Sequence, residues 1–145
     1  MPSITNYHQN KLIDARWRAQ VYGPPATNYF ALFTAAPGVA GGGTEAAYTG
    51  YARVAVTSAL ASFAGTQSAG STVASSGTSG QTSNNAAITF GAPASGPSTQ
   101  VSVGIYDASS AGNLWDFNAL TTSRTLNNGD SPPAFAIAAF TYAVS

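Results

Sequence analysis

Apolar residues in this chain come in short runs separated by turn-forming residues, a pattern typical of β-rich proteins. Residues 29–34 are apolar on both faces, as in a central strand, and Pro37 ends this run. Residues 100–107 alternate apolar and polar side chains, which predicts a strand buried on one face. Further strands are expected over 51–60 and 86–90.

Residues 114–117 are expected to form the return strand of a hairpin, because the Gly112-Asn113 turn signal separates them from residues 100–107. Together with the other runs they make roughly seven short strands at a spacing typical of antiparallel proteins. The chain is therefore predicted to be mainly β, an antiparallel β-sandwich or jelly roll.

The last apolar run, residues 135–144, changes its parity. Large side chains occupy odd positions up to Ile137 and even positions from Phe140 onward. One continuous strand would turn one of these two sets to solvent, because successive side chains point to opposite faces. A bulge or kink is therefore predicted near Ala138-Ala139.

One N-terminal helix is predicted over about residues 5–18. Thr5 or Asn6 can cap it, and the Gly-Pro-Pro sequence at residues 23–25 ends any structure that continues beyond the helix. Apolar residues at helical spacing predict an amphipathic helix that lies across the β body or reaches a neighbour (Leu12, Ala15 and Ala19).

Residues 66–85 are rich in Ser, Gly, Thr, Gln and Asn, with Val73 as the one large aliphatic side chain. Such a segment cannot build a core, so it is expected to be a flexible loop, an extended arm or a stretch that orders on contact. The chain otherwise has the length and apolar content of a single folded domain, so residues 1–145 are assigned to one β-sandwich domain.

Charge is scarce and balanced: five Lys or Arg face five Asp or Glu among 145 residues. A net charge of zero gives no field that would attract nucleic acid, so no nucleic-acid partner is expected. No apolar run approaches the roughly 18–20 residues of a membrane span, so no membrane partner is expected either. A nearly neutral surface gives little charge repulsion between protein molecules, which favours a protein that is part of an assembly.

Few residues here can carry chemistry, because the chain has one His and no Cys. His8 lies in no recognisable motif and is expected on the surface. The two carboxylates of a glycosidase could come from any two of the five acids, and Asp107 and Asp116, which flank the predicted hairpin, could approach each other. For these two, bonds to nearby backbone N–H groups are the preferred interpretation. No catalytic residue, cofactor or metal site is predicted, and the chain is not expected to be an enzyme.

The two tryptophans have different expected roles. Trp115 stands between Leu114 and Phe117, which predicts a core position. The trio Arg16, Trp17 and Arg18 instead places a large amphipathic side chain between two guanidinium groups, a combination typical of interface anchors. This trio is therefore the predicted contact surface.

Several short motifs resemble those of a family of small tailed-bacteriophage virion proteins. They extend over nearly the whole chain, and include Asn10-Lys11-Leu12-Ile13-Asp14, Gly50-Tyr51-Ala52-Arg53-Val54, Ser83-Asn84-Asn85-Ala86-Ala87 and Gly104-Ile105-Tyr106-Asp107-Ala108. Members of this family are described as tail-fibre-like or as minor structural proteins of the particle. The resemblance implies a particle component made in the host cytoplasm.

Two functions are open for such a component. The leading hypothesis is a capsid cement or decoration protein on the outer surface of the virion, which bridges major capsid protein subunits and pairs with itself as a dimer or trimer. The alternative is a tail-fibre or receptor-binding module that recognises a host-surface glycan, and it predicts exposed aromatic residues clustered in a concave site.

Overall fold

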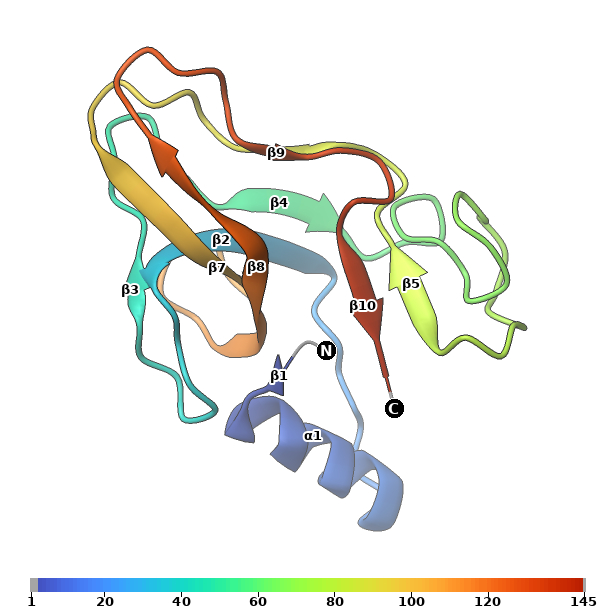
Figure 1. Ribbon diagram of the computed structural model, residues 1–145. Helices are drawn as coiled ribbons and strands as arrows, with labels where there is room; N and C mark the ends of the chain where they lie inside the picture. The colour runs from blue at the N-terminus through green and yellow to red at the C-terminus, as the bar shows by residue number, and fades with distance from the viewer. Residues whose placement is uncertain (1–2, 145) are drawn as a thin grey trace.

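The computed structural model describes residues 3–144. One helix and ten strands are present in this part of the chain (Figure 1). The helix is α1 (Asn6–Trp17). The strands are β1 (Ser3–Ile4), β2 (Thr27–Ala35), β3 (Thr44–Glu45), β4 (Val54–Thr57), β5 (Gln81–Ser83), β6 (Ile88–Thr89), β7 (Ser98–Tyr106), β8 (Leu114–Leu126), β9 (Ala134–Phe135) and β10 (Thr141–Ala143).

The main sheet has the strand order β1-β8-β7-β2-β3, with β4 also paired to β2. Every pairing in it is antiparallel, and β7 and β8 form the predicted hairpin. Two small antiparallel sheets, β10-β5 and β6-β9, complete the strand pairing. The prediction of a mainly β fold with one N-terminal helix is confirmed.

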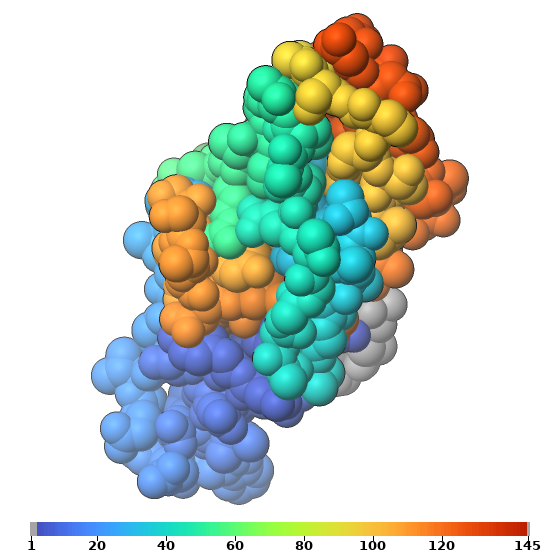
Figure 2. Space-filling view, turned by 90° about the vertical axis from the view of Figure 1, so that its left-hand side faces the viewer, coloured from blue at the N-terminus to red at the C-terminus, as the bar shows by residue number. Residues whose placement is uncertain are grey.

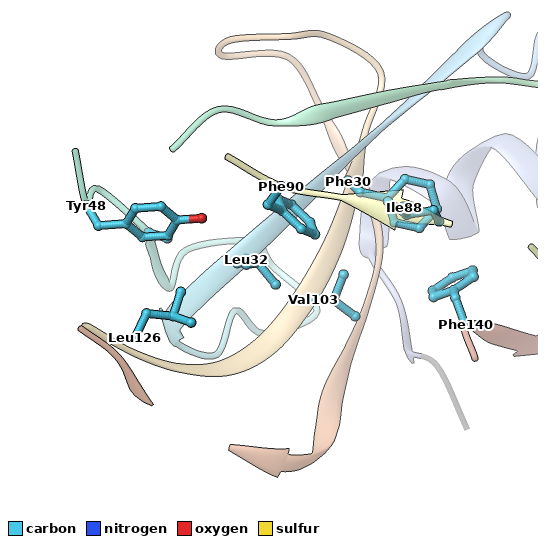
Figure 3. Packing of buried hydrophobic residues seen from close by; sticks show 9 residues of the cluster. Phe30, Leu32, Tyr48, Ile88, Phe90, Val103, Leu126 and Phe140 are labelled. Carbon is cyan, nitrogen blue, oxygen red and sulfur yellow. The ribbon is translucent and has the colours of Figure 1, made fainter. Parts of the chain in front are cut away.

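The core lies between the main sheet and the segments that carry the two small sheets (Figure 3). Phe30, Leu32 and Val103 project from the main sheet toward Ile88 and Phe140 of the other layer. Burying one such side chain stabilises the fold by roughly 1.5–3 kcal/mol. Two unequal layers around an apolar core are compatible with the predicted sandwich or jelly roll.

A smaller cluster occupies the other face of β2, where Ala31 and Phe33 pack against Leu114. These two residues alternate with Phe30 and Leu32 of the main core. The prediction that this strand is apolar on both faces because both faces are covered is therefore confirmed.

The predicted break in the last strand is also confirmed. Ala138 has a φ of 60°, and the amide of Ala139 donates to the carbonyl of Ala136 at 3.0 Å, so the chain turns between β9 and β10. The turn sends β9 to pair with β6 and β10 to pair with β5. The change of parity thus marks the point where the chain leaves one small sheet for the other.

Other strand boundaries differ from the expected ones. Strand β4 is shorter than the predicted 51–60. Strand β8 extends far beyond residue 117, through hydroxyl-rich residues 121–125 that are exposed and so lack an apolar pattern. The hydroxyl groups of Thr99 and Thr125 lie 2.8 Å apart across this part of the hairpin.

Residues 66–80 form an irregular loop, as predicted, but the end of the Ser/Gly-rich segment is strand β5. The side chain of Gln67 organises the loop. Its amide nitrogen donates to Ser71 Oγ at 2.7 Å and its amide oxygen accepts from the amide of Ser76 at 3.3 Å. A polar segment without a core can thus be held by its own hydrogen bonds.

Helix α1 begins after Thr5, whose side chain accepts a hydrogen bond from the amide of His8 at 3.4 Å. This N-cap was predicted, but the amphipathic pattern was wrong, because His8 is the one buried residue of the helix. Leu12 is 40% exposed and Ile13 is 53% exposed. In the space-filling view the arm, defined as residues 5–26, extends below the β body (Figure 2). Helix α1 is too short and too polar to cross a membrane. Residues 3–144 contain no helix that is longer than α1.

Candidate binding site at the base of the arm

The site begins with an irregularity in the β7–β8 hairpin. Ile105 pairs with Asp116 and Tyr106 with Leu114, which leaves Trp115 as an extra residue without a partner. Such a bulge changes the direction in which neighbouring side chains point. As a result, two consecutive residues of β8, Trp115 and Asp116, both contact the arm.

Trp115 is 4% exposed, so its predicted core position is confirmed. Its ring packs against three rings of the arm, with centroid distances of 5.3 Å to Tyr7, 5.0 Å to His8 and 5.9 Å to Tyr22. The arm also meets β8 through its backbone, where the amide of Thr5 donates to the carbonyl of Trp115 at 3.0 Å. Trp115 is therefore the apolar base on which the arm rests.

His8 is only 7% exposed, so the expectation of a surface histidine was wrong. Its Nδ1 lies 2.8 Å from Asp116 Oδ1, and its Nε2 lies 2.6 Å from the Tyr22 hydroxyl. When Nδ1 donates to the carboxylate, Nε2 accepts from the phenol. Both ring nitrogens are thus used by partners that lie far away in sequence.

Asp116 joins a third element to this network, because its Oδ1 also accepts a hydrogen bond from the Tyr142 hydroxyl of β10 at 3.0 Å. Burial and the negative charge of Asp116 raise the pKa of both Tyr142 and Tyr22 above the ordinary phenol value. Both phenols therefore remain protonated. We call His8, Tyr22, Asp116 and Tyr142 the clasp, because they tie the arm to β8 and β10.

A cavity of about 320 Å³ lies beside the clasp. Its apolar wall consists mainly of aromatic and proline rings: Tyr22, Pro24, Phe63, Trp115, Phe140 and Tyr142. Polar groups reach it from His8, Asn28, Ser58 and Asp116. We call this cavity the clasp pocket.

Asp116 also borders a second hollow of about 110 Å³ between β8 and β10. Within residues 3–144 no group donates to its Oδ2 atom, whereas Oδ1 accepts from two partners. The carboxylate can therefore still accept hydrogen bonds from a ligand.

The two aspartates of the hairpin do not act together. Asp107 accepts hydrogen bonds from the Asn113 amide at 2.7 Å and from Trp115 Nε1 at 3.2 Å, which confirms turn chemistry for this residue. Burial alone would raise the pKa of Asp107, but these hydrogen bonds outweigh it and hold the pKa below its usual value. Asp116 instead accepts hydrogen bonds from His8 and Tyr142 within the clasp.

The predicted contact trio lies at the far end of α1 and is exposed. The Arg16 guanidinium lies 4.9 Å from the centre of the Trp17 ring, and Trp17 is 75% exposed. Arg18 is held by Asp14, with 2.8 Å between Nη1 and Oδ1. The structure does not bring this trio to the clasp pocket.

Nowhere in residues 3–144 do three His, Asp or Glu side chains gather as metal ligands do. The clasp itself was missed from the sequence. The one signal for it was Asp116, a carboxylate inside an otherwise apolar strand, since a buried charge requires a partner.

Comparison with known proteins shows the family of the chain. A search of curated proteins found no significant match. The family described as "Podophage GP4 fiber I protein gp80" matches residues 3–143, which agrees with the resemblance seen in the sequence motifs. The chain therefore belongs to this family of phage virion structural proteins.

Proposed function

We propose that this virion protein is a fibre module that binds a sugar of the host-cell surface in the clasp pocket. The observation that carries the proposal is the combination of aromatic walls with one carboxylate whose Oδ2 atom has no partner in the described chain. The flat face of a pyranose ring stacks on aromatic side chains, and its hydroxyl groups donate to carboxylates.

The dimensions and the rim of the pocket support a small polar ligand. A volume of about 320 Å³ is at the lower end of the range of ligand pockets, which is roughly 300–1,000 Å³. At the rim, Asn28 Nδ2 donates to Ser58 Oγ at 2.9 Å, and this hydroxyl donates to the carbonyl of Pro25 at 2.7 Å. Rim and base thus offer both donors and acceptors.

We propose that the site binds sugar without hydrolysing it. Glycoside hydrolysis uses two carboxyl groups that face each other about 5–10 Å apart. The described lining of the clasp pocket contains one, Asp116. Both nitrogens of His8 are already hydrogen-bonded, so this residue is a positioning group within the clasp.

The family description favours a fibre over the capsid shell, which was the leading hypothesis from the sequence. A cement protein that bridges major capsid protein subunits is the rival location. Electron microscopy of purified particles separates the two. Density for this chain at the fibre supports our proposal, and density across the joints of the shell overturns it.

Sugar binding is tested with the purified protein on a glycan array and by saturation-transfer NMR. Ser58→Trp places a large ring at the rim of the clasp pocket and is expected to weaken binding at least tenfold. Thr57→Trp is the matched control, because Thr57 is exposed on β4 and does not line the pocket. Thermal melting of both variants verifies that they fold. A glycan array without hits, or an equal loss of sugar binding in both variants, would contradict the proposal.

A further inference from the structure

We propose that α1 docks through an exposed stripe, Leu12, Ile13, Arg16 and Trp17, into an apolar groove with an acidic rim on a different protein of the virion. This inference concerns another surface than the clasp pocket and does not depend on sugar binding.

The four side chains form one continuous surface. Ile13 and Trp17 are one helical turn apart, as are Leu12 and Arg16, so the members of each pair are neighbours on the helix. The exposed fractions are 40% for Leu12, 53% for Ile13 and 75% for Trp17. Arg16 stacks on the Trp17 ring at 4.9 Å, which joins the two rows.

Ile13 and Trp17, the outer row of the stripe, face away from the β body, whereas Leu12 lies one turn after His8 at the inner edge. Trp17 follows the buried His8 by nine residues, which at about 3.6 residues per turn is two and a half turns. Trp17 therefore lies on the opposite side of α1 from the clasp. The base of the helix is fixed by bonds from Thr5 Oγ1 to the carbonyl of Leu114 at 2.6 Å and from the Asn6 amide to the carbonyl of Val39 at 2.8 Å.

Charge indicates what kind of partner covers the stripe. Lys11, Arg16 and Arg18 are three of the five cationic side chains of the protein. Because Arg18 pairs with Asp14, Arg18 of the predicted trio is not included in the stripe. Lys11 and Arg16 carry the remaining positive charge of α1. An interface that buries an arginine beside a tryptophan is favoured by an acidic group on the other side.

A second copy of this chain offers no fully exposed acidic residue. Of the five Asp and Glu residues, Asp116 is buried and the other four are half-buried: Asp14, Glu45, Asp107 and Asp130. Charge complementarity therefore favours a different chain.

The mode of binding follows from the shape of the stripe. Apolar anchors one turn apart on one face of a helix are typical of a helix that lies in a groove. Tryptophan and arginine are also the residues that contribute most when an interface buries them. The groove therefore needs an apolar floor for Ile13 and Trp17, and carboxylates near Arg16.

The test uses particles assembled in cells that express variants of the full chain. Trp17→Ala is expected to lower the number of copies per particle at least tenfold, and Arg16→Glu to lower it further because it repels an acidic rim. The matched controls are Val73→Ala, an exposed apolar residue on the loop, and Arg124→Glu, an exposed arginine on β8. Both are expected to leave incorporation unchanged.

A photo-crosslinking residue in place of Asn10, an exposed residue one turn before Ile13, identifies the partner in intact particles. Crosslinks to an acidic segment of a different virion protein support the proposal. Crosslinks to a second copy, stripe-dependent binding to anionic lipid vesicles, or equal incorporation of all variants overturn it. Purified Trp17→Ala is expected to retain sugar binding, so failure of docking and failure of the sugar proposal give different results.

Discussion

The β body and the arm are held in place by different forces. In the body, Phe30 and Leu126 are 0% exposed, and the core around them is formed by apolar side chains of both layers. In the arm, α1 buries His8 alone, and directional hydrogen bonds of the clasp together with Trp115 fix its base. Apolar packing tolerates small adjustments, whereas a clasp requires each partner in place.

Because they are held by different forces, the two regions need not open together. Segments with few buried apolar contacts open at a smaller free-energy cost than the whole fold. We therefore expect the arm to detach locally while the body stays folded. Variants of the core and of the clasp separate these two events.

The largest effect is expected from Phe30→Ala, which removes a fully buried ring from the body. Its ring centroid lies 4.9 Å from that of Phe140 in an edge-to-face contact. Loss of a buried phenylalanine costs about 3–5 kcal/mol of unfolding free energy, because a cavity remains. Urea unfolding followed by circular dichroism measures this change. Val73→Ala, at a side chain 61% exposed, is the control and is expected to change stability by less than about 0.5 kcal/mol.

A medium effect is expected from Asp116→Ala, which breaks the clasp. His8 Nδ1 and the Tyr142 hydroxyl both lose their acceptor. Leaving such buried donors without a partner costs about 1–3 kcal/mol. Hydrogen exchange is expected to speed up in α1 and to stay unchanged in β2 and β7.

Asp14→Ala is the matched control for the clasp, because it removes an acid that pairs with an exposed arginine of the same helix. It is expected to leave exchange at the base of α1 unchanged. Equal acceleration in the arm and the body after Asp116→Ala would contradict the separation of the two regions.

The parts of the fold that were predictable are those that local pattern determines. The short apolar run 29–34 and the alternating pattern of 100–107 predicted strands, and the parity change before Phe140 showed where the last strand breaks. The second half of β8 was not predictable, because residues exposed on both faces have no apolar alternation.

The candidate site was less predictable than the fold because it depends on distant pairing. The core position of Trp115 follows from its neighbours in sequence, but the bulge that turns it toward the arm depends on the register with β7. His8 and Asp116 are 108 positions apart, so no local spacing reveals their contact. A lone histidine on a polar helix gives the same local pattern whether or not a carboxylate reaches it.

The body also has a polar cluster, and it provides the last contrast with the clasp. Arg53 Nη2 lies 2.7 Å from Glu45 Oε2, and the Tyr51 hydroxyl donates to Glu45 Oε1 at 2.8 Å. Arg53 Nη1 also donates to the carbonyls of Ala108 and Ala111, both at 2.8 Å. The cluster therefore links strand β3 and the segment before β4 to the β7–β8 turn.

The smallest effect is expected from Glu45→Gln, and it depends on pH. Burial alone would raise the pKa of Glu45, but hydrogen bonds from Arg53 and Tyr51 and the positive charge of Arg53 hold it below its usual value of 4.5. The ionised carboxylate therefore stabilises the fold above pH 4.5, by about 1 kcal/mol, and this contribution is lost as pH falls through the lowered pKa. The difference in unfolding free energy between the wild type and Glu45→Gln, measured by urea unfolding over a pH series, should shrink on acidification. Asp14→Asn, at an exposed pair, is the control and is expected to change the unfolding free energy by less than about 0.5 kcal/mol. A constant difference down to acidic pH would show that shape, and not charge, holds Glu45 against Arg53.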